Sequence, residues 1–263
     1  MAQPAPDLQP SAAHRPGGWL AAYWRPEVAP LSAQVQAALA AGPRPAELFL
    51  SSAQAPALLE DGYGPVETGW TWTRGQGVRV NCLTPMPGVT PAMWDWWFAW
   101  HGADSDRYKL WHPRAHLAVG WADGGDALGG YVGRTSRVVE YLGASRMRFA
   151  ISFAPPAAFG LDPALLARKG QVAVCARAGL DGSGFASGAM IHQLRPTADG
   201  CEMRSRFWML GDDLRLGGLG RPLTRLIPPR PQEAEALLVH CAEEMGHLAG
   251  ILPALYAEFG ADQ

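Results

Sequence analysis

Five short strand-like runs follow one another in the second half of the chain, and a single long amphipathic stretch closes it. The runs are YVGRTSRVVEYL, MRFAISF, QVAVCARA, GAMIHQL and EMRSRFWML, and Pro, Gly and Asp turns separate them. The hairpin spacing of the last runs is typical of a mainly antiparallel sheet. The closing stretch, from Gln232 to Phe259, predicts one helix with a kink near Pro253. This order predicts an α+β fold in which the sheet curves around the C-terminal helix and leaves a cavity for an apolar ligand.

The 263 residues are enough for one large domain with a smaller appendage. We expect residues 1–17 to form a disordered arm and residues 18–64 to form an N-terminal helical and wrapping segment. Within that segment Glu27–Ala41 predicts a helix, whereas the remainder carries too many Pro and Gly residues to build a core of its own. The main, catalytic domain is then expected to span residues 65–263.

The main domain is predicted to open with two strands and a helix. The runs TGWTW and VRVNCLT alternate as strands do, with a glycine-containing turn between them. The Trp-rich segment TPAMWDWWFAWHG then begins a helix, with Thr90 as its N-cap and Pro91 as its first residue. A shorter helix, LDPALLARK, follows the second of the five later runs.

Charge and cysteine content exclude several classes of protein. A formal net charge of −2 and a pI of about 6.4 leave no strongly basic surface to hold nucleic acid. No stretch approaches the roughly 18 uninterrupted apolar residues of a membrane span, and the first residues lack the apolar core of a signal peptide. The four cysteines are scattered without a CxxC pair, which predicts reduced, buried thiols. We therefore expect a cytoplasmic protein that binds neither nucleic acid nor membrane.

Tryptophan is concentrated in one segment of a weakly charged chain. Charged residues make up 17% of the sequence, and six of its eleven tryptophans fall between Trp94 and Trp121. The spacing of Trp94, Trp97 and Trp100 lets the three rings share or flank one helix face. We expect part of this cluster to line or support an aromatic-binding cavity and the rest to be ordinary core.

The apolar stripe of the C-terminal helix contains two polar residues, His240 and Glu244. The stripe itself is formed by Leu237, Cys241, Met245, Leu248, Ile251 and Leu252. A buried, unpaired carboxylate is very costly, so Glu244 must be protonated, paired or bound to a metal ion. Residues four apart meet one turn apart on the same face, and both could reach one ion. The alternative is a His–Glu hydrogen bond in the core, or an arginine partner for Glu244.

Two further histidines precede the five strand-like runs and are also four residues apart. They are His112 and His116 in RYKLWHPRAH, where the intervening Pro113 favours a turn over a regular helix. His112 is therefore expected to be structural or bound in a loop. His101, at the end of the Trp-rich helix, could instead cap that helix through its dipole.

The remaining titratable candidates each have a structural alternative. In VVEYLG strand alternation turns Glu140 inward if Val138 faces inward, although a strand glutamate is more often exposed. His192 is flanked by apolar residues, as a satisfied core histidine would be. On the C-terminal helix Glu243 projects off the apolar stripe and is expected to be solvated, whereas His247 at its edge could support the His240 and Glu244 pair.

Several segments resemble, in this order, the 2,4-diacetylphloroglucinol hydrolase family. They are WDWWFAWHG, RYKLWHPRAH, YVGRT with VVEYLG, IHQLR with RSRFWM, and LLVHCAEEMGHL, which together cover roughly residues 65–260. The family consists of zinc-dependent enzymes that hydrolyse the carbon–carbon bond between an acyl group and a phenolic ring. Its catalytic domain is similar to the helix-grip fold of Bet v 1 and START-like lipid-transfer domains, so the resemblance implies the layout inferred above. It also implies a homodimer.

The resemblance implies a Zn²⁺ site of two histidines and two glutamates, namely His116, Glu140, His240 and Glu244. It further implies that Tyr108 contacts a phenolic oxygen of the substrate and that His192 is catalytic or orients the substrate. Together with Tyr108, Phe207 and Trp100 are the expected substrate-binding residues. Phe207 stands where the diacetylphloroglucinol enzyme has a tyrosine, and the position near Val119 lacks an expected polar group. These departures leave the exact substrate open.

The resulting hypothesis is attack of zinc-bound water on the ketone of an acylated polyphenol such as 2,4-diacetylphloroglucinol. Tautomerisation of the ring to a keto form would turn the ring carbon into a leaving group, while Tyr108 and His192 stabilise the oxygen charge. Two alternatives remain. One is a zinc enzyme that cleaves β-diketones in a retro-Claisen manner, and the other is a non-catalytic helix-grip carrier of an aromatic or lipid ligand.

Overall fold

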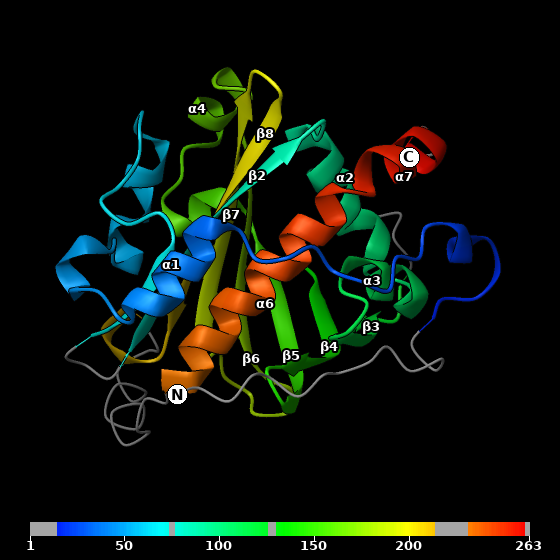
Figure 1. Ribbon diagram of the computed structural model, residues 1–263, viewed down its shortest axis with the longest axis horizontal. Coiled ribbons are helices and arrows are strands. Elements are labelled where there is room, and N and C mark those ends of the chain that lie inside the picture. The colour runs from blue at the N-terminus through cyan, green and yellow to red at the C-terminus, as the bar shows by residue number, and fades with distance from the viewer. Residues whose placement is uncertain (1–14, 74–76, 126–129, 214–230, 261–263) are drawn as a thin grey trace.

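An eight-stranded antiparallel sheet forms the centre of the computed structural model, which describes residues 15–73, 77–125, 130–213 and 231–260 (Figure 1). The strands follow the order β1-β2-β8-β7-β6-β5-β4-β3, and every neighbouring pair runs antiparallel. Their bounds are β1 (Gly69–Trp72), β2 (Val78–Pro87), β3 (His116–Trp121), β4 (Thr135–Leu142), β5 (Ser145–Ala154), β6 (Val172–Leu180), β7 (Gly188–Thr197) and β8 (Gly200–Met209). Consecutive strands are neighbours except where β2 joins β8, as hairpin-spaced runs predict.

The longest described helix, α6, lies across the inner face of the sheet, where it contacts β1, β2 and β4 (Figure 1). The α-helices are α1 (Ala33–Ala41), α2 (Pro91–His101), α3 (Ser105–Trp111), α4 (Pro163–Arg168), α6 (Pro231–Ala249) and α7 (Leu252–Phe259). Short 3-10 turns are η2 (Gly18–Ala22), η3 (Ala46–Leu48), η4 (Ser52–Leu59), η6 (Pro156–Phe159) and η7 (Gly211–Asp213). The predicted α+β fold, an antiparallel sheet wrapped on a long C-terminal helix, is confirmed. None of the helices in the described ranges has the length and apolar character needed to cross a membrane.

The C-terminal stretch forms two helices where the sequence predicts one kinked helix. Helix α6 ends at Ala249, and α7 begins at Leu252 with Pro253 in its first turn. Proline has no N–H and its ring clashes with the carbonyl four residues earlier, so a continuous helix would place that clash at Ala249. The break lets α7 pack on α2, where the rings of Tyr256 and Trp96 lie 5.4 Å apart.

The N-terminal helix is shorter than the sequence predicts. Its expected start is Glu27, but α1 begins at Ala33, where the hydroxyl of Ser32 accepts a hydrogen bond from the backbone of the first turn. Pro30 lies between the two positions and would remove a helical hydrogen bond if the helix extended past it. By contrast, α2 begins at Pro91 as predicted, directly after its predicted N-cap, Thr90. The predicted arm falls mostly on residues 1–14, outside the described residues.

Helix α3 and strand β3 have no counterpart among the predicted elements, and they position one end of the inner face. Asp104 caps α3 by accepting from the backbone N–H of Asp106 at 2.7 Å, and α3 ends at Trp111, two residues before Pro113. Strand β3 is an edge strand with an irregularity just after His116. Its pairing with β4 places His116 directly opposite Glu140.

The space between the sheet and α6 is filled mainly by apolar and aromatic side chains. All six tryptophans of the predicted cluster are buried members of the main apolar core, namely Trp94, Trp96, Trp97, Trp100, Trp111 and Trp121. All four cysteines are buried and free. The inner face therefore offers an apolar surrounding in which any charged group needs a specific partner.

The outer face of the sheet is covered by the segment that precedes β1. Ala55, Leu58 and Leu59 of η4 pack with Ile191 and Trp208 of β7 and β8 in a second apolar cluster. The indole N–H of Trp208 also donates to the carbonyl of Leu50 at 2.8 Å. This segment buries part of its surface against strands far along the chain instead of forming its own core.

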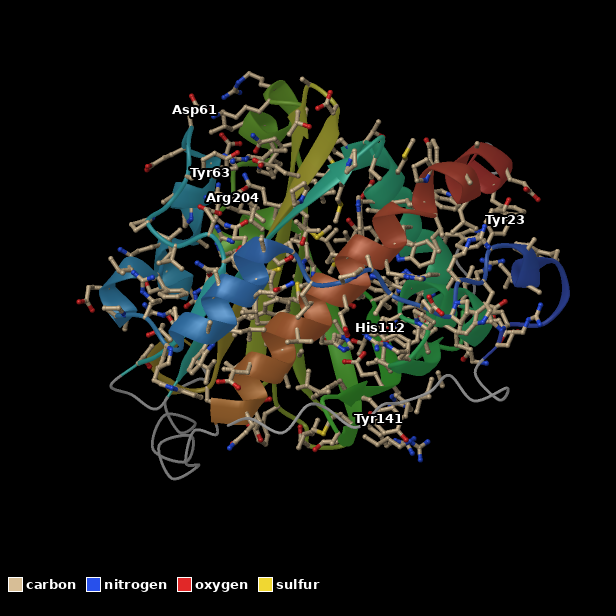
Figure 2. All side chains as sticks on the ribbon, viewed as in Figure 1. Tyr23, Asp61, Tyr63, His112, Tyr141 and Arg204 are labelled. Atoms are coloured by element: carbon tan, nitrogen blue, oxygen red, sulfur yellow. The ribbon has the colours of Figure 1, made fainter. Side chains whose placement is uncertain are left out.

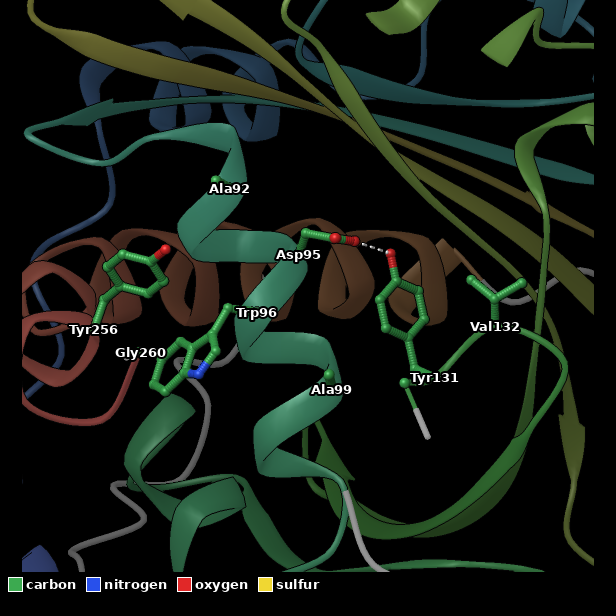
Figure 3. A pocket seen from close by; sticks show the side chains of 9 residues that line it. Ala92, Asp95, Trp96, Ala99, Tyr131, Val132, Tyr256 and Gly260 are labelled. Atoms are coloured by element: carbon green, nitrogen blue, oxygen red, sulfur yellow. Dashed lines mark hydrogen bonds between the residues drawn. The ribbon is translucent and has the colours of Figure 1, made fainter. Parts of the chain in front are cut away.

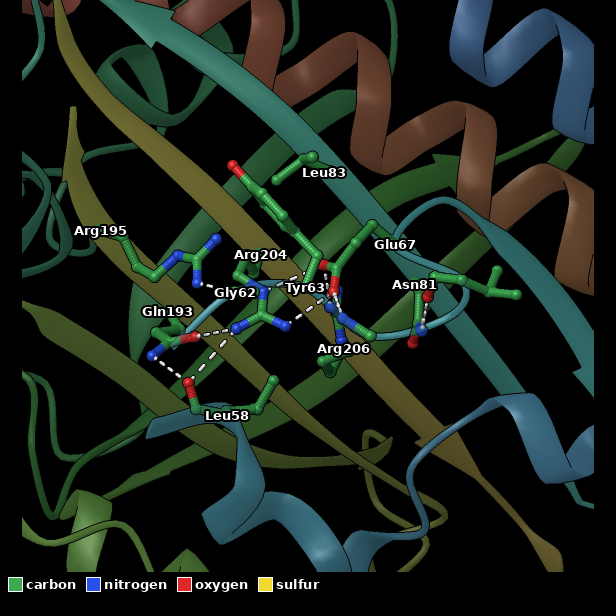
Figure 4. Close-up of polar contacts among 12 residues, drawn as sticks. Leu58, Gly62, Tyr63, Glu67, Asn81, Leu83, Gln193, Arg195, Arg204 and Arg206 are labelled. Carbon is green, nitrogen blue, oxygen red and sulfur yellow. Dashed lines mark hydrogen bonds and ion pairs between the residues drawn. The ribbon is translucent and has the colours of Figure 1, made fainter. Parts of the chain in front are cut away.

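A buried carboxylate fastens the same segment to β8 (Figure 4). Glu67 accepts hydrogen bonds from Arg204, at 2.7 and 3.0 Å, and from Arg206. Arg204 also donates to the carbonyl of Leu58 and the side chain of Gln193, both at 3.3 Å. Burial alone would raise the pKa of Glu67, but the two guanidinium groups outweigh it and lower the pKa to about 2. The two arginines thus share one ionised partner.

We expect the substitution Glu67→Gln to destabilise the protein by about 3–5 kcal/mol at pH 7, because it leaves two buried guanidinium groups without a counter-charge. A carboxylate with a lowered pKa stabilises the fold above its ordinary value of 4.5, and that stabilisation is lost as pH falls from there toward 2. Urea denaturation at several pH values measures both effects, with exposed Glu60→Gln as the matched control. Equal acid sensitivity in Glu67→Gln and the unchanged protein would show that this network is not what acid disrupts.

Candidate metal centre

Three buried side chains come together between the sheet and α6. They are His116 at the start of β3 and His240 and Glu244 on α6, and one ligand atom of each lies within 4.8 Å of the others. The Nε2 atom of His116 lies 3.4 Å from Nε2 of His240 and 3.4 Å from Oε2 of Glu244. Nε2 of His240 lies 3.6 Å from the same carboxylate oxygen. Among the described residues this is the one group of three histidine, cysteine or carboxylate side chains that is so closely spaced.

Backbone contacts aim the His116 ring at this group. Its backbone N–H donates to the carbonyl of His112 at 3.0 Å, and its ring Nδ1 lies 3.2 Å from the carbonyl of Tyr108. A carbonyl only accepts, so Nδ1 carries the proton and Nε2 turns a lone pair toward His240 and Glu244. The ring also stacks on Tyr108, with centroids 3.9 Å apart and planes at 3°. Metal-binding histidines are commonly oriented by such a carbonyl behind the ring.

Burial and mutual charge set the protonation of the three groups. Burial, aided by the charge on His240, lowers the pKa of His116 well below 6.5. Burial alone would lower the pKa of His240 too, but Glu244, with Glu140 and Glu243, outweighs it and raises the pKa to about 9. Burial also raises the pKa of Glu244 against the opposing charge of His240. A divalent cation would take the place of the proton on His240 and compensate the buried carboxylate.

The donor set and its spacing fit zinc. Two imidazole nitrogens and a carboxylate oxygen are ligands that zinc accepts. Tetrahedral zinc, with ligand bonds of about 2.0–2.1 Å, separates its ligand atoms by roughly 3.3 Å. The observed separations in the group are 3.4, 3.4 and 3.6 Å. Little movement of these side chains would therefore be needed to bind the ion.

Glu140, the remaining predicted ligand, lies beside this group but is not one of its three members. Its Oε2 atom is 3.8 Å from Nε2 of His116, as the opposed positions of the two residues on β4 and β3 require. The same oxygen accepts a hydrogen bond from the hydroxyl of Tyr108. A carboxylate has two oxygens, so Glu140 can keep Tyr108 and still present an oxygen to a metal ion.

Tyr108 on α3 links Glu140 to His116. Its ring is buried against His116, and its single hydroxyl proton is directed at Glu140. Burial raises the pKa of Tyr108 well above 10, and the charges of Glu140 and Glu244 raise it further. The phenol therefore keeps its proton at neutral pH.

His192 and Phe207 lie together on neighbouring strands β7 and β8. Their ring centroids are 5.5 Å apart, and Nδ1 of His192 lies 2.8 Å from the hydroxyl oxygen of Ser205. Burial lowers the pKa of His192 to about 4, so the imidazole is neutral. His101, at the end of α2, is also neutral, because burial lowers its pKa to about 4; its Nδ1 lies 2.7 Å from the carbonyl of Trp97.

Trp100 faces α7 and not the three-residue group. Its ring lies 4.9 Å from that of Trp96 and 5.7 Å from that of Phe259. Near these rings a hollow of about 420 Å³ opens between α2, α7 and the residues after 130 (Figure 3). It is lined by Ala92, Asp95, Trp96, Ala99, Gly130, Tyr131, Val132, Tyr256 and Gly260. None of the predicted site residues lines this hollow.

Sequence reasoning missed a second pair next to the group, formed by buried His112 and half-buried Glu243. Glu243 was expected to be solvated, but its side chain is only 19% exposed, and it contacts both His112 and Arg114. Nε2 of His112 lies 3.3 Å from the Glu243 carboxylate, and the ring of His112 is 5.0 Å from that of His240. The available signal is proximity to the predicted ligands, because His112 precedes His116 by four residues and Glu243 is next to Glu244 in the sequence.

Comparison with known proteins identifies the family. A family model described as the DAPG hydrolase PhiG domain matches residues 50–257. The chain belongs to this family. Phloretin hydrolase of Eubacterium ramulus is 30% identical over 249 residues, which cover 90% of this chain and 88% of the relative. The 2,4-diacetylphloroglucinol hydrolase of Pseudomonas protegens is 32% identical over 221 residues, which cover 77% of this chain and 72% of the relative. The expected family is confirmed, and this chain is a hydrolase.

Solved structures similar to this family member include Ara h 8.0201 and protein CV1439 from Chromobacterium violaceum. Ara h 8.0201 has a TM-score of 0.40 and 10% identity, with 68% of this chain and 97% of the other covered. For CV1439 the TM-score is 0.38 and the identity 12%, with 66% and 97% covered. Because both scores are low, the fold assignment rests on the strand order and helix placement described above.

We expect Glu244→Gln to abolish tight zinc binding, lowering the metal content from about one ion per chain to below roughly a tenth, because a neutral amide is a poor zinc ligand. The metal-free variant should be less stable than the metal-free parent at neutral pH, because buried His240 loses the carboxylate that favours its protonated form. Elemental analysis and thermal unfolding measure these two effects. Glu235→Gln on the same helix is the matched control. Retention of stoichiometric zinc by a folded Glu244→Gln variant would contradict the assignment.

Proposed function

We propose that this member of the DAPG hydrolase family is a zinc-dependent enzyme that cleaves the carbon–carbon bond between an acyl group and a polyphenol ring. The substrate would be 2,4-diacetylphloroglucinol or a related acyl phenol. The net reaction adds water across the bond, with the hydroxyl going to the acyl carbon and a proton to the ring carbon. The products are a carboxylic acid and the deacylated polyphenol.

The observation that carries the proposal is the buried group of His116, His240 and Glu244 at zinc-like separations. It lies in a chain whose relatives are named phloretin hydrolase and 2,4-diacetylphloroglucinol hydrolase. These three residues would hold the ion, with Glu140 as the fourth ligand. When bound, zinc would act as a Lewis acid toward the ketone and make a nearby water molecule more acidic.

Tyr108 is the residue best placed to handle a proton next to the reacting carbonyl. Its hydroxyl keeps its proton at neutral pH and is directed at Glu140, beside His116. In that arrangement Tyr108 offers only lone pairs, which accept a hydrogen bond from a phenolic hydroxyl. Release from Glu140 would free the O–H to stabilise a developing oxyanion or to protonate the ring carbon.

His192 and Phe207 supply the part of the proposed site on β7 and β8. Neutral His192 can donate only one ring N–H, and its Nδ1 already contacts the hydroxyl of Ser205. Its other nitrogen is therefore the one available to orient a substrate oxygen. Phe207 offers ring area without a hydrogen-bonding group, which favours a substrate with an apolar or hydrogen atom at the facing ring position.

The non-catalytic carrier is less well supported than a hydrolase. A carrier would leave the zinc-like separations of His116, His240 and Glu244 without a role, whereas a metal-dependent hydrolase accounts for them. A zinc enzyme of retro-Claisen type would use the same three residues to cleave a β-diketone.

The homodimer and the cytoplasmic location stay predictions.

We expect the zinc-loaded protein to hydrolyse acylated polyphenols, and we expect His116→Ala and Glu244→Gln to lower kcat/KM by more than about 1,000-fold. Loss of a metal ligand removes the Lewis acid, which supplies several kcal/mol of stabilisation to the transition state. A screen of acyl phenols and β-diketones, followed by mass spectrometry of the carboxylic acid, measures the reaction. Turnover of β-diketones alone would favour the retro-Claisen enzyme. Full activity in folded, zinc-free variants would refute a metal-dependent reaction.

Phe207→Tyr tests the substrate assignment. We expect it to improve kcat/KM by about 3- to 10-fold for an acyl phenol carrying one more ring hydroxyl, the effect of one added hydrogen bond. Substrates without that hydroxyl should be turned over no faster. Phe159→Tyr, on η6 of the outer face, is the matched control. An equal change on both substrates would mean that position 207 does not face the ring.

A further inference from the structure

His112 is a buried histidine that lies next to the group of His116, His240 and Glu244, called the metal group below, without belonging to it. It follows α3 and is only 2% exposed, and Figure 2 shows it beside α6. Its ring centroid lies 5.0 Å from that of His240 and 5.5 Å from that of His116, and those two rings are 5.3 Å apart. The three imidazoles therefore form a nearly equilateral triangle. His112 is thus as near to His116 and to His240 as those two residues are to each other.

The tautomer of His112 is fixed by an anion behind it. Nε2 of His112 lies 3.3 Å from the carboxylate of Glu243, which Arg114 also holds through a hydrogen bond. An ionised carboxylate only accepts, so Nε2 carries the proton of the neutral ring. The lone pair of His112 is then on Nδ1. A carboxylate that orients a histidine in this manner is a recurring device in sites where the other nitrogen has a task.

The Nδ1 atom is buried and has no hydrogen-bond partner among the described residues. Leaving a buried acceptor unpaired costs free energy, so native structures rarely do so without a water molecule or ligand to fill the position. Glu243 is held in place by its ion pair with Arg114. A flip of the His112 ring that interchanged Nδ1 and Nε2 would therefore break the contact between His112 and Glu243. The orientation that leaves the Nδ1 lone pair without a partner is thus fixed by neighbouring residues and does not result from a loosely held side chain.

We propose that Nδ1 of His112 is a binding-site acceptor for an O–H group of the molecule that occupies the metal centre, most directly a phenolic hydroxyl of the substrate. The inference rests on the proposed function for the identity of that molecule. An acyl phenol with a hydroxyl beside its ketone presents two oxygens side by side, one for the metal group and one for His112. A water molecule has the same O–H chemistry, and the experiment below separates the two sources. Glu243 is then a positioning residue, which acts through the tautomer of His112.

Two substitutions divide the roles of the two ring nitrogens. His112→Gln keeps an N–H near the position of Nε2 and loses the acceptor at Nδ1. His112→Asn keeps an oxygen near the position of Nδ1 and loses the contact with Glu243. We expect His112→Gln to keep its zinc and to lose roughly 5- to 100-fold in kcat/KM, the range for one unpaired buried hydrogen-bonding group, and His112→Asn to retain more activity.

To determine whether the hydroxyl belongs to the substrate or to water, the loss of kcat/KM in His112→Gln is measured on two substrates, one with and one without the hydroxyl beside the ketone. A loss confined to the hydroxylated substrate assigns His112 to the substrate, and an equal loss on both assigns it to a water molecule. Calorimetric binding of 1,3,5-trihydroxybenzene to the metal-free protein gives a readout that does not depend on turnover. There we expect His112→Gln to weaken binding by roughly 5-fold or more.

Loss of zinc from His112→Gln, or kcat/KM and trihydroxybenzene binding unchanged by it, would overturn the proposal. Glu243→Gln adds a test of positioning, because an amide can pair with either tautomer. It should lower kcat more than it raises KM, with zinc retained, whereas a purely structural role would lower the thermal midpoint and leave the ratio of the two constants unchanged. If the unchanged enzyme hydrolyses no acyl phenol, the proposed function fails, but the calorimetric comparison still decides the role of His112.

Discussion

The burial of Glu244 on the inner side of α6 is the constraint on which the rest of this structure depends. A carboxylate in an apolar interior must have a partner, and here it has two histidines, one from its own helix and one from the opposite edge of the sheet. Everything that positions His116 serves this requirement: the turn after α3, the pairing of β3 with β4, and the carbonyl of Tyr108. The fold and the site are therefore one arrangement.

A second buried carboxylate, Glu67, is paired on the outer face of the sheet, but its partners are of a different kind. Glu67 is as deeply buried as Glu244, but its partners are two permanently charged guanidinium groups. Arginine cannot act as a metal ligand and does not lose its proton, so that network holds the wrapping segment in place and offers no chemistry. Histidine can do both. The two buried carboxylates of this chain thus differ in the residue type of their partners, and only the histidine partners of Glu244 could share it with a metal ion.

Much of the fold could be predicted from periodicity, because strands with alternating side chains and a helix with one apolar stripe are strong local signals. The helical periodicity that reveals the apolar stripe of the C-terminal helix also shows that His240 and Glu244 lie within it. Strand β3 could not be predicted, because a six-residue edge strand that contains a glycine has little pattern of its own. Pro253 causes the break before α7, but a proline predicts the first residue of a helix only to within about one or two positions.

The site was harder to predict than the fold because its parts are brought together by long-range pairing. His116 lies opposite Glu140 only through the register of β3 and β4, which no local pattern encodes. Glu243 seemed exposed since it is off the stripe of its own helix, yet α3 and the turn after it cover that side. Off-stripe residues can be buried wherever a second element packs on the same helix.

The distance along the chain between the members of the metal group has a consequence for folding. His116 and His240 are separated by 124 positions, with five strands and the whole antiparallel meander between them. Closing so long a loop costs entropy that only the completed sheet and the docked α6 can offset. The full three-residue group therefore requires both the paired β3 and the docked α6. If the group binds an ion, uptake of that ion would report that the sheet and α6 have come together.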